Sequence, residues 1–120
     1  MRYLCLAYGD KSKMQALPRD ELVAIVNKCK PYDDELNKTK GLILHEGLSW
    51  DVTTVKPRNG KVSVTDGPFV EVKEQAGGVF LIEAKDLNDA IRIASLHPAA
   101  HLGEELGWGI EIRPIEAFNP

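Results

Sequence analysis

Tyr3-Leu4-Cys5-Leu6-Ala7-Tyr8 is the stretch that decides the fold, and it ends at Gly9-Asp10. An unbroken apolar and aromatic run of this length is typical of a strand buried on both faces rather than of a helix. Val79-Phe80-Leu81-Ile82, which follows Gly77-Gly78, has the same character. A sheet that contains both strands cannot easily turn either face to water, so we expect helices on one face and a partner sheet on the other. The pattern therefore predicts a homodimer.

Two amphipathic segments are expected to supply the helices. The first begins near Pro18, which suits the first turn of a helix. Its apolar residues recur at helical spacing: Leu22, Ile25, Val26, Cys29 and Leu36. Pro31 interrupts this stripe and should kink the helix or split it in two, and Gly41 is a natural stop. The segment before it, residues 11–16, is expected to be a polar loop.

Asp86 and Asp89 have the spacing of a capping box and predict the start of the second helix. Its apolar face is formed by Leu87, Ala90, Ile91 and Ala94. The helix should end at His97-Pro98, because proline disfavours the α conformation in the residue before it. His97 would then lie near the negative end of the helix dipole, which favours its charged form.

The other periodic segments are expected to be strands. Residues 42–48 and 52–56 have strand character, and Asn59-Gly60 between valines is a strong hairpin signal. A last strand is indicated by alternating isoleucines, Ile110, Ile112 and Ile115. The order of elements predicts an α+β fold, a ferredoxin-like βαββαβ plan with an inserted β-hairpin, in one domain over residues 1–120.

Composition excludes several classes of function. The 120 residues carry a net charge of −3, so the surface as a whole should not attract a nucleic acid. No apolar run reaches the roughly 18 residues that cross a bilayer, so we expect no membrane association. Cys5 and Cys29 form no CxxC pair, which favours a reducing, cytoplasmic location.

The central segment resembles a known family. Thr65-Asp66-Gly67-Pro68-Phe69 and the Val70–Gln75 stretch after it are similar to the signature block of DGPF-domain proteins, which belong to the YCII-related group. The resemblance implies a dimeric α+β barrel in which two ferredoxin-like sheets pack face to face. It also implies kinship with small enzymes that act on cyclic organic substrates without a cofactor. Many DGPF genes lie beside genes for extracytoplasmic-function sigma factors, so the resemblance also implies a regulatory link.

Two features depart from the family pattern. The segment 101–108 is longer than the usual link to the last strand and could reshape the mouth of a pocket. Pro31 is also unusual inside the first helix. The substrate of a relative is therefore not carried over to this chain.

Asp66 and His97 are the candidate catalytic residues. Asp66 could accept hydrogen bonds from its own turn, or the turn could aim its carboxylate into a pocket as a general base. His97 could cap a helix, or it could change charge near neutral pH and pair with Asp66 as an acid–base dyad. The resemblance adds that YCII-related proteins are suspected of using a His–Asp pair.

Five further residues are candidates for substrate binding. Lys73 and Glu74 follow the turn, where they could line a cleft or form a solvated charge pair. Glu111 and Arg113 alternate with isoleucines and should face the dimer cavity, where Arg113 could hold a carboxylate or form an interfacial salt bridge with Glu111. Tyr8 could add a hydroxyl.

No metal or cofactor is expected. His97 and His101 have the spacing of ligands on one helical face, but Pro98 makes a regular helix there unfavourable. Two classes of function stay open. One is an enzyme that moves protons on a small anionic or cyclic organic molecule. The other is a non-catalytic dimeric ligand-sensing or regulatory module linked to sigma-factor systems.

Overall fold

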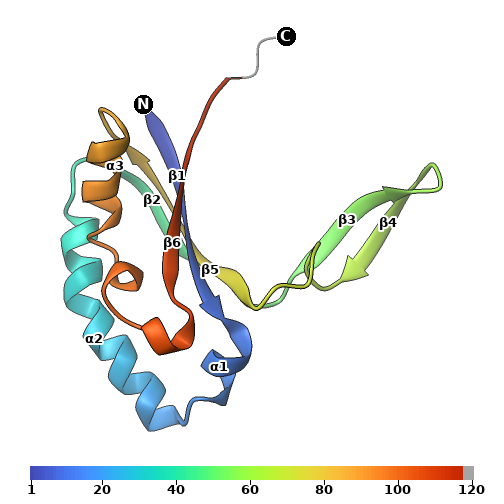
Figure 1. Ribbon diagram of the computed structural model, residues 1–120, viewed down its shortest axis with the longest axis horizontal. Coiled ribbons are helices and arrows are strands. Elements are labelled where there is room, and N and C mark those ends of the chain that lie inside the picture. The colour runs from blue at the N-terminus through green and yellow to red at the C-terminus, as the bar shows by residue number, and fades with distance from the viewer. Residues whose placement is uncertain (118–120) are drawn as a thin grey trace.

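A computed structural model of the chain describes residues 1–117 (Figure 1). Four antiparallel strands form one sheet in the order β2-β5-β1-β6: β1 (Arg2–Asp10), β2 (Leu42–Gly47), β5 (Glu74–Glu83) and β6 (Gly109–Pro114). A separate two-stranded hairpin is formed by β3 (Thr53–Arg58) and β4 (Lys61–Asp66). The helical elements are α1 (Lys11–Ala16), α2 (Arg19–Asn37), α3 (Leu87–Ala94) and two 3₁₀ turns, η1 (Pro98–Ala100) and η2 (Glu104–Leu106). The chain is therefore α+β.

The central strand β1 divides the sheet into a covered and an uncovered face. Tyr3 and Cys5 are buried and lie in the core with Phe80 and Ile82 of β5. Both α2 and α3 lie on this face (Figure 1). Leu4 alternates with these residues and stays half-exposed on the other face. Within residues 1–117 of one chain, only one face of the continuous apolar strand is covered.

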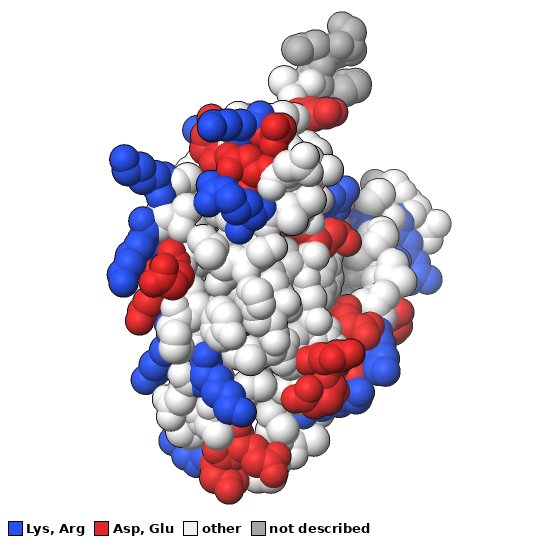
Figure 2. Space-filling view, turned by 60° about the vertical axis from the view of Figure 1, so that its left-hand side comes forward, with Lys and Arg blue, Asp and Glu red and all other residues white. Residues whose placement is uncertain are grey.

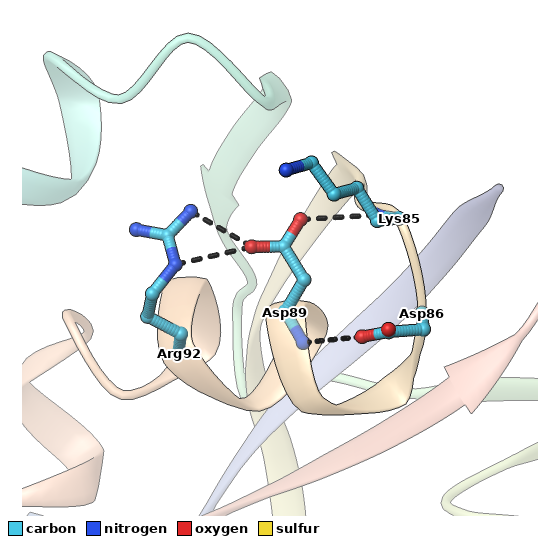
Figure 3. Close-up of polar contacts among 4 residues, drawn as sticks. All are labelled: Lys85, Asp86, Asp89 and Arg92. Atoms are coloured by element: carbon cyan, nitrogen blue, oxygen red, sulfur yellow. Dashed lines mark hydrogen bonds and ion pairs between the residues drawn. The ribbon is translucent and has the colours of Figure 1, made fainter.

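The start of α3 is fixed by the capping residues that the sequence predicts (Figure 3). Asp86 Oδ1 accepts the backbone N–H of Asp89 at 2.9 Å. The Asp89 carboxylate in turn accepts the backbone N–H of Lys85 at 3.0 Å and two N–H groups of Arg92. These interactions, the Lys85 N–H first, lower the pKa of Asp89. The short helix then buries one face against the sheet, through Ala90, Ile93 and Ala94.

The long helix α2 is one continuous helix, with Pro31 inside it, so the helix does not split at the proline. Leu36, close to its C-terminal end, is its buried residue, whereas Val26 in the same apolar stripe is 49% exposed. The helix is thus seated on the core at one end and stands away from the sheet along most of its length.

The turns differ in part from the sequence expectations. Residues 11–16 form helix α1 instead of a loop, because Asp10 accepts the backbone N–H of Lys13 at 3.1 Å and caps it. The Asn59-Gly60 hairpin is confirmed, with φ values of 52° and 74° that suit a type I′ turn. The α3 helix ends at Ala94, three residues before His97, and His97 is the N-cap residue of η1.

Candidate functional site

A cavity of about 590 Å³ lies between α2 and the covered face of the sheet. It exists because α2 packs closely only near Leu36. Its walls come from α2, from β1, β2 and β5, from η1 and from two tryptophans, Trp50 and Trp108. The lining is mostly apolar, as is common for small-molecule sites.

Glycines in the strands make room for the two indoles. A Cβ atom on Gly77 would lie 2.8 Å from Cη2 of Trp50, so the indole would have to shift to admit any side chain there. A Cβ atom on Gly9 would lie 3.3 Å from Trp108 and 3.4 Å from Trp50. The two rings therefore meet over the bare backbone of Gly9. Trp108 belongs to the long segment 101–108, which supplies part of the cavity wall.

Three titratable side chains converge in this cavity: Asp33 of α2, His45 of β2 and His97 at the start of η1. One carboxylate oxygen and one nitrogen of each ring lie within 4.8 Å of one another. Both imidazoles pack on Phe80, and the His97 ring is stacked on it with 5.1 Å between ring centres. Aromatic packing thus fixes the positions of both rings.

The turn at η1 fixes the tautomer of His97. Nδ1 of His97 accepts the backbone N–H of Ala99 at 2.9 Å, so the proton of the neutral ring lies on Nε2. The side chain is only 9% exposed, and burial, together with His45, lowers its pKa to about 4. The expectation that the dipole of α3 favours the charged form is wrong, because the desolvation cost of the imidazolium outweighs it.

His45 and Asp33 complete the cluster, His45 with a free ring nitrogen and Asp33 with a carboxylate of raised pKa. Nδ1 of His45 lies 3.0 Å from Oδ1 of Asn37, and an amide oxygen only accepts, so the unshared pair of His45 lies on Nε2. Burial raises the pKa of Asp33, and the nearby His45 opposes this. The cluster therefore offers an imidazole N–H donor, an imidazole acceptor and a carboxylate whose pKa is raised by burial. Such a set can move a proton to and from a bound molecule.

The composition of the cluster, two imidazoles and one carboxylate, also occurs in metal sites. A metal-binding histidine normally donates its second ring N–H to an acceptor. His97 does the opposite, because its Nδ1 accepts the Ala99 N–H. A metal at Nε2 would need the other tautomer and would set two N–H groups against each other. The arrangement fits proton transfer better than metal binding.

The predicted catalytic pair is brought only half into this site. His97 lies in the cavity, whereas Asp66 is exposed at the end of β4, in the hairpin that projects away from the sheet (Figure 1). Asp66 is not among the residues that line the cavity. Asp33 takes the place beside His97. A signal for it existed, because Asp33 lies four residues after Cys29 and three before Leu36, within the apolar stripe of α2.

The predicted substrate-binding residues lie in three places. Tyr8 lines the cavity, and its hydroxyl lies 3.4 Å from Oε1 of Glu111, while burial and this carboxylate raise its pKa. Glu111 and Arg113 pair with residues of the uncovered face and point away from Ile110 and Ile112, as the alternation predicts. Lys73 and Glu74 precede and begin β5, and neither lines the cavity.

The outer surface of the helical side carries its charges at the margin. In Figure 2 lysine, arginine, aspartate and glutamate side chains surround a broad area that has none.

Among residues 1–117, no helix is long and apolar enough to span a membrane.

The sequence of the chain is similar to that of a known family and of a known relative. A chain from Rhizobium meliloti (strain 1021), described as an uncharacterised protein, is 25% identical over 122 residues, which cover 100% of this chain and 96% of that relative. The family model of the YCII-related domain matches residues 1–119. Because this match covers nearly the whole chain, the protein belongs to the YCII-related domain family.

Proposed function

We propose that the protein binds a small, ring-shaped organic molecule in the cavity beneath α2 and moves a proton on it without an organic cofactor. The observation that carries this proposal is a buried His97 that is held neutral, in one tautomer, beside His45 and Asp33. Burying such a group costs folding free energy, and perturbed groups of this kind cluster at functional sites.

The shape of the cavity supports a ring as the ligand. Two indoles lie against glycine backbone on one side, and α2 forms the opposite wall. Flat aromatic walls favour a flat ligand, because its ring can stack on them. Lys30 also lines the cavity and could hold an anionic substituent of the ring.

The chemistry follows from the two imidazoles. His45, with its unshared pair on Nε2, or the carboxylate of Asp33 takes a proton from an acidic C–H or O–H group of the ligand. The Nε2–H of His97 donates a hydrogen bond to the oxygen on which negative charge develops. Return of the proton to another atom of the ligand completes an isomerisation. This assignment replaces Asp66 by Asp33 as the acidic partner of His97.

The proposal includes a homodimer with face-to-face ferredoxin-like sheets. The strand order β2-β5-β1-β6, with α2 and α3 on one face, supports it. The uncovered face carries a group of half-exposed or exposed apolar residues: Leu4, Leu6, Leu44, Val79 and Leu81. A second copy would remove this group from water. The two cysteines, which are free in the structure, suit a reducing compartment such as the cytoplasm.

Proton transfer can be tested before a natural substrate is identified. A set of cyclic ketones and lactones is incubated with the protein in D₂O, and NMR follows exchange of C–H for C–D. We expect exchange with the unaltered protein, and at least a roughly hundredfold slower rate for Asp33→Asn or His45→Gln. Asp66→Asn serves as the matched control and should keep the full rate. Loss of exchange in Asp66→Asn but not in Asp33→Asn would restore the pair predicted from the sequence.

Binding is measured independently of turnover. Trp50 and Trp108 are both of the tryptophans in the chain and both line the cavity, so intrinsic fluorescence reports its occupation. The aromatic anion 1-anilinonaphthalene-8-sulfonate is a suitable probe. Saturable quenching that ring compounds reverse, with no exchange for any of them, would favour the ligand-sensing module over the enzyme. No saturable quenching would contradict both.

A further inference from the structure

The β3–β4 hairpin is amphipathic. The strand register places Val55 opposite Val64, and Pro57 opposite Val62, on one face. The three valines are 62%, 66% and 75% exposed for Val55, Val64 and Val62. The other face carries the polar and basic pairs Lys56–Ser63 and Arg58–Lys61. Alternation of this kind is the pattern of a strand pair that packs one face on something apolar.

Nothing in the described part of the same chain covers this apolar face. The hairpin forms a sheet of its own and projects from the body as an arm (Figure 1). It contributes to a radius of gyration of 16.3 Å, whereas a compact domain of this length has roughly 14 Å. A two-stranded hairpin alone is marginally stable in water. The arm, defined as β3 and β4, therefore needs a cover from outside residues 1–117.

The position of the arm indicates a second copy as that cover. The arm leaves the end of the main sheet and extends on the side away from α2 and α3 (Figure 1). The half-exposed Leu4 and Leu6 lie on this same uncovered side of the sheet. A molecule seated on the sheet face would therefore lie within reach of the arm. With two-fold symmetry, each copy supplies one arm and one sheet face to the other.

Charge complementarity favours the same occupant. Residues 53–66 contain Lys56, Arg58 and Lys61 against Asp66, which gives a net charge of +2. The whole chain has a net charge of −3, so the remaining residues carry −5. A basic arm is attracted to an acidic body, which raises the rate and the specificity of association.

We propose that the apolar face of the β3–β4 arm packs against a second copy of this chain, so that two copies clasp each other with exchanged arms. This inference rests on the proposed dimer and adds the arm as a second part of its interface. The arm follows directly on the segment that carries Trp50, so clasping would also hold one wall of the cavity in place.

Sedimentation velocity over a concentration series tests the arm with two matched variants. Val64→Glu places a charge on the apolar face, and Ser63→Glu places the same charge on the opposite face of the same strand. We expect Val64→Glu to raise the dimer dissociation constant at least tenfold, and Ser63→Glu to leave it within about threefold. Val64 is exposed within the chain, so circular dichroism should show that both variants fold.

Leu6→Glu on the uncovered sheet face separates the failure of the arm from the failure of the dimer. If Leu6→Glu dissociates the dimer and Val64→Glu does not, the sheet interface stands and the arm proposal is overturned. If the unaltered protein is a monomer at all concentrations, both are overturned. Hydrogen exchange gives a second readout, because the amides of the arm should become protected as protein concentration rises. Protection that is independent of concentration would contradict the proposal.

Discussion

The helices α2 and α3 lie on the same face of the sheet but pack on it to different extents. The eight residues of α3 bury Ala90, Ile93 and Ala94. The nineteen residues of α2 bury Leu36. Helix α3 is capped and closely packed, whereas α2 stands away from the strands and leaves a cavity of about 590 Å³. Helix α3 buries one face against the sheet, whereas α2 leaves a space between itself and the strands.

The difference can be traced to particular residues. Pro31 removes a backbone hydrogen bond inside α2, and Asp33 puts a carboxylate into its apolar stripe. The N-cap residue of α2 is Pro18, which makes no side-chain hydrogen bond to the first turn of the helix. Stacking of Tyr32 on His101, with 5.0 Å between ring centres, ties α2 to the turn after η1 and keeps Asp33 near His97.

The largest expected effect compares the two helices directly. Ile93→Ala removes a side chain that is 2% exposed in the α3 contact, so it should cost about 3 kcal/mol of unfolding free energy. Val26→Ala on α2 should cost less than about 1 kcal/mol, because the side chain is half-exposed beside a cavity. Urea unfolding measures both. Equal losses would show that α2 is packed as closely as α3.

A second expectation concerns the stability cost of the buried imidazole. The pKa of His97 lies at about 4 in the folded chain, against 6.5 for the unperturbed group. The stability from this group is complete above pH 6.5. The free energy of unfolding falls as the pH drops from 6.5 to 4, because in this range His97 binds a proton in the unfolded chain but not in the folded chain. The loss between pH 7 and pH 4.5 should be roughly 2–3 kcal/mol.

His97→Asn is the control for this pH dependence. Asparagine can accept the Ala99 N–H at the same position but does not titrate. Urea unfolding at the two pH values should show a smaller loss for His97→Asn than for the unaltered chain, by about the amount given above. An identical pH dependence in both proteins would mean that His97 is not the desolvated group.

The smallest effect tests the geometry of the cavity wall. Gly77→Ala would set a Cβ atom 2.8 Å from Trp50, so the indole must move at a cost of about 1–2 kcal/mol. Its fluorescence and the affinity for 1-anilinonaphthalene-8-sulfonate should change with it. Gly47→Ala also lies at the cavity, with no atom within 4 Å of its new Cβ, and should leave both unchanged. If the two variants behave alike, Trp50 does not rest on the strand.

Local patterns were a good guide wherever short-range chemistry decides the outcome. The capping residues Asp86 and Asp89, the Asn59-Gly60 turn and the orientation of Ile110 and Ile112 all follow from nearest-neighbour rules, and the structure agrees with them. The helical segment 11–16 was missed because its cap, Asp10, ends the preceding strand. Asp10 is both the last residue of β1 and the cap of α1, so one position carries the signal for a strand end and the signal for a helix start.

The candidate site was less accessible from sequence, because its parts are far apart in the chain. His97 was identified as a candidate, but its acidic neighbour depends on how far α2 stands from the sheet, which no local pattern specifies. Its charge state was also misjudged, because the helix dipole can be read from sequence whereas desolvation depends on packing around Phe80.

The sequence by itself determined the family, the α+β class and the strands that form the sheet, because period-two and period-3.6 patterns and turn residues act over a few neighbours. Only the tertiary structure decided that Asp33, His45 and His97 meet, and that Trp50 and Trp108 lie over Gly9. The physical reason is that a cavity is the space left between elements. Its contents follow from the relative placement of helix and sheet, which many weak contacts set together.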